Sequence, residues 1–140
     1  MATYFLDTNV LSEVVRPRPD RSVLEFLAAE RDVWISVIVF HEFEFGMERL
    51  QDPDRRANLR RFHDATRARY EDWIVPVDIK IAELGGQLRG QAARLGRVLH
   101  AVDSLIGATA LASDATLATR NTRDFDGLGV KLINPWETRL

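Results

Sequence analysis

The chain opens with "MATYFLDTNVLSEV" (residues 1–14), in which a short apolar run meets an acidic turn. Aromatic and aliphatic side chains fill "TYFL" (3–6), as is typical of a strand buried on both faces of a parallel sheet. Asp7 follows at once. An aspartate there either caps the helix that begins after it or lies at the sheet edge where α/β proteins bind ligands. The stretch predicts a strand, a turn and a helix, and it leaves both roles open for Asp7.

Four further runs suit strands, and the segments between them suit helices. The strand candidates are 33–37, 73–77, 115–119 and 130–134, and Pro76 places the second of these at an edge or a strand end. The helical patterns are 21–30, 37–50, 78–95 and 101–112. Alternating strands and helices predict right-handed crossovers and a parallel sheet covered on both faces. A length of 140 residues with 46% hydrophobic residues predicts a single domain, residues 1–140.

Composition narrows the classes of function. The chain has no cysteine, which excludes disulfides and thiolate metal sites. No window approaches a membrane span, and the N-terminus lacks the features of a secretory signal, so we expect a cytoplasmic protein without membrane contact. Residues 49–69 hold seven arginines against three aspartates. The whole chain has 17 Arg and only 2 Lys, and phosphate binding and genomic base composition explain this excess of arginine about equally well.

Two acidic residues lie on predicted helices. Glu42 falls in "SVIVFHEFEFG" (36–46) on a mostly apolar stripe, so we expect it to face inward, and Gly46 one turn later suggests a close approach. Asp103 opens "DSLIGATALAS" (103–113) and shares a stripe with the small residues Gly107 and Ala110, which leaves room for a ligand. The alternatives are an ordinary surface acid for Glu42 and a helix-dipole role for Asp103.

A further acid follows the strand candidate 115–119. Asp124 lies in "ATRNTRDFDGLGV" (118–130), and Asp126 is a nearby competitor for any role assigned to it. Thr119 and Asn121 are polar groups suited to hydrogen bonds that support a site. The predicted fold places these residues at the same sheet edge as Asp7.

The convergence of these acids would have a chemical consequence. Two carboxylates about 4 Å apart repel by roughly 4 kcal/mol at an effective dielectric constant near 20, so the group needs protons, basic partners or metal. Ligands that are all oxygen select Mg²⁺ or Mn²⁺ over zinc. Such a site activates water for phosphodiester hydrolysis.

Other chemistries lack a necessary part. His41 and Glu42 start a zinc-protease pattern, but Phe45 stands where the second histidine belongs. "GGQLRG" (85–90) lacks the Lys-Ser/Thr of a phosphate-binding loop. Asn9 stands where a haloacid-dehalogenase-type phosphatase would carry its second aspartate, and neither lysine follows a strand as a phospho-acceptor receiver domain requires.

Four motifs together resemble a known family. "FLDTNVLSE", "SVIVFHEFEFG", "DSLIGATAL" and "TRNTRDFDGLGVKLINPW", in this order and spacing, resemble the PIN domain and, more closely, the VapC (FitB-like) toxins of prokaryotic type II toxin–antitoxin pairs. The resemblance implies a Rossmann-like three-layer α/β/α sandwich with a central parallel sheet. It also implies an endoribonuclease that depends on Mg²⁺ or Mn²⁺.

The resemblance assigns roles to residues of this chain. The implied catalytic quartet is Asp7, Glu42, Asp103 and Asp124, of which Asp7, Asp103 and Asp124 are the implied metal ligands. The implied polar supports are Thr8, Asn9, Thr119 and Asn121, whereas Asp126 has no fixed counterpart. The implied partners are a second copy in a homodimer and a cognate antitoxin, which blocks the site and alone contacts operator DNA.

Two hypotheses of different class remain. The first is a metal-dependent ribonuclease, with RNA approaching along Arg16, Arg18, Arg120 and Arg123. The second is a non-catalytic subunit of a DNA-binding, transcription-regulating complex, whose acidic pocket receives an arginine from its partner. The apolar residues Phe40, Phe43, Phe45 and Met47 exceed one core-facing stripe, so they predict either core packing or a partner interface.

Overall fold

The computed structural model describes residues 2–29 and 31–138. Within these residues, one parallel sheet has the strand order β3-β2-β1-β4-β5. Its strands are β1 (Thr3–Leu6), β2 (Asp32–Ser36), β3 (Ile74–Val75), β4 (Thr116–Ala118) and β5 (Lys131–Ile133). All five lie within the predicted runs or within one residue of them, and the segment with Pro76 forms an edge strand, as predicted.

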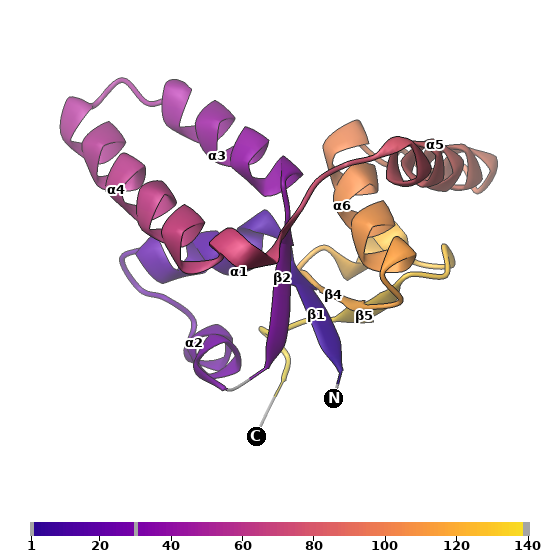
Figure 1. The fold of residues 1–140 in the computed structure, drawn as a ribbon, viewed down its shortest axis with the longest axis horizontal. Coiled ribbons are helices and arrows are strands. Elements are labelled where there is room, and N and C mark those ends of the chain that lie inside the picture. The colour runs from indigo at the N-terminus through magenta and orange to yellow at the C-terminus, as the bar shows by residue number, and fades with distance from the viewer. Residues whose placement is uncertain (1, 30, 139–140) are drawn as a thin grey trace.

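Helices cover both faces of this sheet. They are α1 (Thr8–Ser12), α2 (Arg21–Ala28), α3 (Ile38–Glu48), α4 (Pro53–Arg69), α5 (Ile79–Arg94) and α6 (Ala101–Ala112), with short 3₁₀ turns η1 (Glu13–Val15), η2 (Glu71–Trp73) and η3 (Thr122–Phe125). Figure 1 shows α1 to α4 on one side of β1 and β2, and α5 and α6 on the other. The predicted three-layer α/β/α sandwich is confirmed.

The strand order has a topological switch point between β1 and β4. From β1 the chain proceeds to β2 and β3 on one side, and it then returns over α5 and α6 to place β4 on the other side of β1. Crossovers that leave neighbouring strands in opposite directions open a crevice beyond the carboxyl ends of those strands. The turns after Leu6 and Ala118 border this crevice.

The core lies beneath the carboxyl ends of the strands. Phe5, Leu6, Ile35 and Leu117 are almost fully buried, whereas the amino-terminal halves of β1 and β2 are only half-buried. The expectation of strands buried along their whole length on both faces is therefore wrong for these halves. In both strands, the buried residues lie in the carboxyl-terminal half, next to the crevice.

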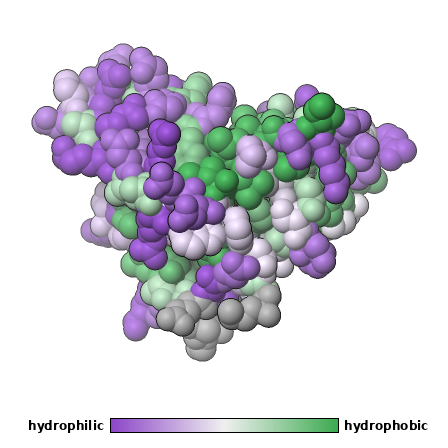
Figure 2. Space-filling view, viewed as in Figure 1, coloured by the Kyte–Doolittle hydropathy of each residue, from purple (hydrophilic) through white to green (hydrophobic). Residues whose placement is uncertain are grey.

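Most of the basic segment, residues 49–69, forms α4. The sequence patterns did not predict this separate helix. Asp52 caps this helix, and Pro53 occupies its first turn. Arg60 and Arg56 reach back to Glu44 and Glu48 on α3, with nitrogen–oxygen distances of 2.6 and 3.3 Å. Hydrophilic residues cover α4 in the space-filling view (Figure 2). Two of the arginines in this segment therefore form ion pairs that connect α4 to α3.

Two expectations for α3 are corrected in part. An added Cβ at Gly46 would meet nothing within 4 Å, so the predicted close approach is wrong. Of the four apolar residues singled out on this helix, Phe43 and Met47 are buried, Phe40 is half-buried, and Phe45 is 59% exposed. Core packing explains most of the surplus.

In the described part of the chain, no helix is long and apolar enough to cross a membrane.

Candidate active site

Asp7 caps a helix and also lies at the carboxyl edge of the sheet. Its backbone N–H donates to the Ala118 carbonyl across the switch point at 2.9 Å, which fixes the residue at the end of β1. Its Oδ1 accepts a hydrogen bond from the Thr8 N–H at 2.7 Å and so caps α1. Its Oδ2 accepts from the buried Thr119 hydroxyl at 2.7 Å. The carboxylate is 3% exposed and held at both oxygens.

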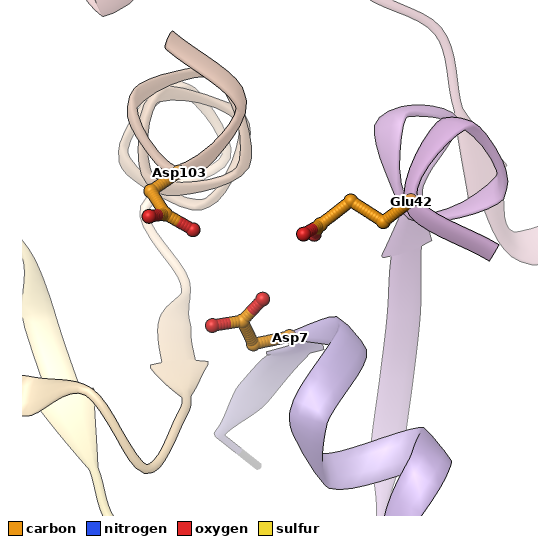
Figure 3. A group of neighbouring side chains, drawn as sticks. All are labelled: Asp7, Glu42 and Asp103. Carbon is orange, nitrogen blue, oxygen red and sulfur yellow. The ribbon is translucent and has the colours of Figure 1, made fainter. Parts of the chain in front are cut away.

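Three of the four predicted acids converge in the crevice. Figure 3 shows Asp7, Glu42 from α3 and Asp103 from the first turn of α6 pointing toward one another. One carboxylate oxygen from each lies within 4.8 Å of the other two. The Thr8 hydroxyl donates to Glu42 Oε1 at 2.5 Å and orients that side chain. Three segments that are remote in the chain thus present one oxygen each to a common point.

The electrostatics of this cluster favour a bound cation. Burial raises the pKa of Asp7 to about 6, and the charges of Glu42 and Asp103 add to this rise. Burial, followed by the Asp103 charge, raises the pKa of Glu42, although the Thr8 hydrogen bond opposes it. Unscreened pairs at this separation repel by roughly 3–4 kcal/mol at an effective dielectric constant near 20. An oxygen-only donor set of this kind fits Mg²⁺ or Mn²⁺.

Asp124 borders the cluster without joining it. The residue is exposed on η3, and its charge is the second cause, after burial, of the raised pKa of Asp103. Arg97, which the sequence analysis did not single out, fixes this turn by donating to the carbonyls of Arg123, at 2.7 Å, and Asp126. A metal-ligand role for Asp124 stays a prediction, and Asp126 is exposed nearby.

The small residue beneath Asp103 serves packing. An added Cβ at Gly107 would lie 2.5 Å from Cε1 of Phe125, which is itself 2% exposed. The expectation that Gly107 leaves room for a ligand is therefore wrong, because the Phe125 ring occupies that room. Since Phe125 belongs to η3, the glycine determines how closely the turn with Asp124 approaches α6.

Replacing Gly107 with alanine should destabilise the protein by about 1–3 kcal/mol, because neither the buried ring nor the helix can yield without repacking. Chemical denaturation measures this loss. Gly46→Ala is the matched control, since that helical glycine has open space around it and alanine should stabilise it by about 0.5–1 kcal/mol. A Gly107→Ala protein as stable as the original would contradict the packing role.

The polar supports form one network with unequal contributions. Asn9 Nδ2 donates to Asp7 Oδ2 at 3.3 Å and approaches the Thr119 hydroxyl at 3.5 Å. Its Oδ1 accepts from the Arg120 N–H at 3.3 Å. Asn121 contributes its backbone N–H, which donates to the Thr119 hydroxyl at 3.0 Å, and the residue is exposed. Thr119 and Asn9 therefore link the strand ends β1 and β4 around the Asp7 carboxylate.

Three of the four predicted RNA-binding arginines line one cleft, which Asn9 links to Asp7 through the backbone N–H of Arg120. Arg16, Arg18 and Arg120 border a space of about 440 Å³, and Arg123 lies outside its lining. Glu13, Pro17, Asp20 and Trp136 complete the lining. No sequence pattern assigned a role to Glu13 or Trp136. The acidic residue in the apolar run "VLSEVV" (10–15) was the available signal for a buried Glu13. Trp136 gave no such signal, because its contact is made 16 residues away.

These features define a Rossmann-like α/β protein with a carboxylate cluster at the switch point of its parallel sheet, where ligands of such proteins bind. The chain belongs to the PIN-domain family, whose model matches residues 4–131. The family predicted from the sequence motifs is thereby confirmed.

Similar proteins match this chain over nearly its whole length. "VapC ribonuclease Y4jK" of Sinorhizobium fredii is 33% identical over 135 residues, which cover 94% of this chain and 96% of that protein. "Toxin FitB" of Neisseria gonorrhoeae is 34% identical over 134 residues, with the same two coverages. The solved structure of FitAB bound to an IR36 DNA fragment matches with a TM-score of 0.88 at 32% identity and covers 99% of each chain.

Proposed function

We propose that the chain is a metal-dependent endoribonuclease and the toxin of a type II toxin–antitoxin pair. The observation that carries the proposal is the convergence of Asp7, Glu42 and Asp103 within 4.8 Å at the switch point of the sheet. The similarity to proteins named VapC ribonuclease and toxin FitB supports the reaction and the biological class.

Each acid has a distinct part in the proposed reaction. Asp7 and Asp103, together with Asp124 from η3, would hold Mg²⁺ or Mn²⁺. When bound, such an ion supplies charge stabilisation for an in-line phosphodiester displacement and acidifies water. Glu42 orients the attacking water or adds a further ligand, and the Thr8 hydrogen bond fixes the carboxylate for either task. Asp7 is the most rigid of the group, because Thr8 and Thr119 hold both of its oxygens.

The proposed partners follow from the same family. A cognate antitoxin would fill the carboxylate cluster with a cationic side chain and would alone contact operator DNA, in line with the DNA-bound FitAB structure. A second copy of the chain would form a homodimer. Hydrophobic residues over α6 and the start of α5 (Figure 2), where Ile79 is 79% exposed, offer apolar surface for such a contact. We also propose that the enzyme acts in the cytoplasm, because its RNA substrate is found there.

A non-catalytic role is the second candidate. The likeness to FitAB in complex with DNA favours a subunit of a transcription-regulating assembly. In that case the acidic pocket only receives the partner's cation. The two candidates differ in what a divalent metal does to the isolated chain.

A circular RNA tests the proposed reaction, because only internal cleavage can linearise it. We expect linear and shorter products with Mn²⁺ or Mg²⁺ and intact circles with EDTA. Gel electrophoresis over a time course measures the rate. Cleavage that persists in EDTA, or a circle that stays intact across a panel of RNAs with either metal, would contradict the metal-dependent endonuclease.

A further inference from the structure

The cleft beside the carboxylate cluster has a basic rim and an aromatic wall. The loop after η1 contributes Arg16 and Arg18, the turn after β4 contributes Arg120, and Trp136 follows β5. The volume of about 440 Å³ falls in the size range of pockets that hold one small ligand. Segments from both ends of the chain thus meet at one concave surface.

The two acids of the cleft are already engaged. Glu13 is 5% exposed, and its Oε2 accepts a hydrogen bond from the Asp20 N–H at 2.8 Å, which ties down the intervening loop. Asp20 Oδ1 accepts from the N–H groups of Ser22 and Val23 and caps α2. Glu13 Oε1 lies 3.6 Å from Arg16 Nη1. Three arginines face these two acids in the lining, so the cleft keeps a net positive charge for a ligand.

Arg120 lies over an aromatic ring in this cleft. Its guanidinium carbon lies 5.0 Å from the centroid of the Trp136 ring, within the range of a cation–π contact. The backbone N–H of Trp136 donates to Asn134 Oδ1 at 3.0 Å, which fixes the backbone turn that carries the indole. A guanidinium fixed against an aromatic ring offers its outer face and edges as a flat, charged platform.

The platform is coupled to the carboxylate cluster through one residue. The Asn9 side chain accepts from the backbone N–H of Arg120 and donates to Asp7 Oδ2, each at 3.3 Å. Because the Arg120 backbone lies next to the residue that contacts Asp7, the Arg120 side chain is within reach of a nucleotide that neighbours a phosphodiester at Asp7. This adjacency points to a single extended ligand for the two features.

We propose that this cleft is a subsite for one unpaired nucleotide of the RNA substrate, next to the bond that is cut. The inference rests on the proposed function. The base stacks on the Arg120 guanidinium, and Arg16 and Arg18 bind the adjoining phosphate. Trp136 is a positioning residue, because its ring holds the Arg120 guanidinium in place. A base inside a duplex is already stacked on its neighbours, so the subsite selects RNA that is single-stranded at this position.

Binding and cleavage together test the subsite. Binding is measured by fluorescence anisotropy with a labelled single-stranded RNA in the Asp7→Asn background, in which cleavage is not expected. Arg120→Lys keeps the charge but loses the plane, so we expect affinity to fall about tenfold while the salt dependence of binding stays the same. Trp136→Leu should weaken binding similarly, and Trp136→Phe should restore most of it. In the cleaving protein these changes should appear in KM more than in kcat.

Arg31→Lys is the matched control. Arg31 is also stacked on an aromatic ring, 4.3 Å from the Phe26 centroid, but it lies at the amino edge of the sheet. Its replacement should change neither RNA affinity nor KM. A duplex of the same sequence should bind more weakly than the single strand and should be insensitive to Arg120→Lys.

The failure of this inference is distinguishable from failure of the proposed function. If the original chain cleaves RNA and the Arg120 and Trp136 variants bind and cleave as it does, the subsite is overturned and the nuclease stands. If Arg120→Lys weakens binding of single strands but no RNA is cut, the subsite stands and the nuclease falls. Equal loss for duplex and single strand would overturn the selection of an unpaired nucleotide.

Discussion

Replacing Asp7 with asparagine should reduce metal-dependent RNA cleavage by about 10²–10³-fold or more while the chain stays folded. Loss of a residue that merely supports a metal ligand commonly costs 10–100-fold, and Asp7 lies in the cluster itself at the switch point. The asparagine keeps the shape of the side chain and retains one oxygen for the N–H of Thr8 or the hydroxyl of Thr119. Initial rates with Mn²⁺ measure the effect.

The same substitution should stabilise the metal-free protein above pH 6. The pKa of Asp7 rises from 3.8 to about 6 on folding, so ionising this carboxyl costs the folded state up to roughly 3 kcal/mol. This penalty is absent at pH values below 3.8, grows as the pH rises from there to about 6, and is nearly constant at higher pH. After about 1 kcal/mol for a lost hydrogen bond, we expect Asp7→Asn to gain about 1–2 kcal/mol at pH 8 in EDTA.

Asp78→Asn is a matched control for both measurements. Asp78 caps α5 through a 2.9 Å hydrogen bond from the Ile81 N–H, as Asp7 caps α1, but it is outside the carboxylate cluster. Asparagine caps helices about as well as aspartate, so its activity should match that of the original chain. If Asp7→Asn cleaves RNA at the original rate, Asp7 is only a helix cap and the proposed centre is wrong.

The acids of the site were predictable from sequence because the fold rules decide where they lie. Asp7 follows a strand, Asp103 lies in the first turn of a helix, and Glu42 lies on a mostly apolar stripe near the start of its helix. In a parallel sheet these positions share one edge, so their convergence follows from topology before any side chain is placed.

What the sequence could not provide depends on contacts between remote segments. Gly107 and Phe125 are 18 residues apart, and the small residue indicated empty space until the ring was seen to fill it. In α3 a glycine also lies four residues after an acid, and there the expected close approach was wrong, because Gly46 faces open space. Arg120 and Trp136 follow different strands, so their stacking depends on how two loops fold. Local pattern determines elements and edges, whereas packing partners require the tertiary structure.

A divalent ion should raise the melting temperature of the isolated chain. Binding to the folded state alone contributes about 2.7 kcal/mol at a concentration 100 times the Kd, which for a chain of this length corresponds to a shift of about 10 °C. Differential scanning fluorimetry with Mn²⁺ or Mg²⁺ against EDTA measures the shift. Asp7→Asn should lose most of it, and Asp78→Asn should keep it.

The pH dependence of this shift separates the two candidate functions. Protons compete with metal for carboxylates, and the pKa of Asp7 is raised to about 6, so the shift should be full at pH 8 and should shrink as the pH falls below 6. A pocket that only receives a partner's guanidinium needs no ion, and its melting temperature would be the same with Mn²⁺ and with EDTA at every pH. That result, with Asp7→Asn already more stable than the original chain in EDTA, would leave the cluster as a docking site, because its repulsion would be real and its metal absent.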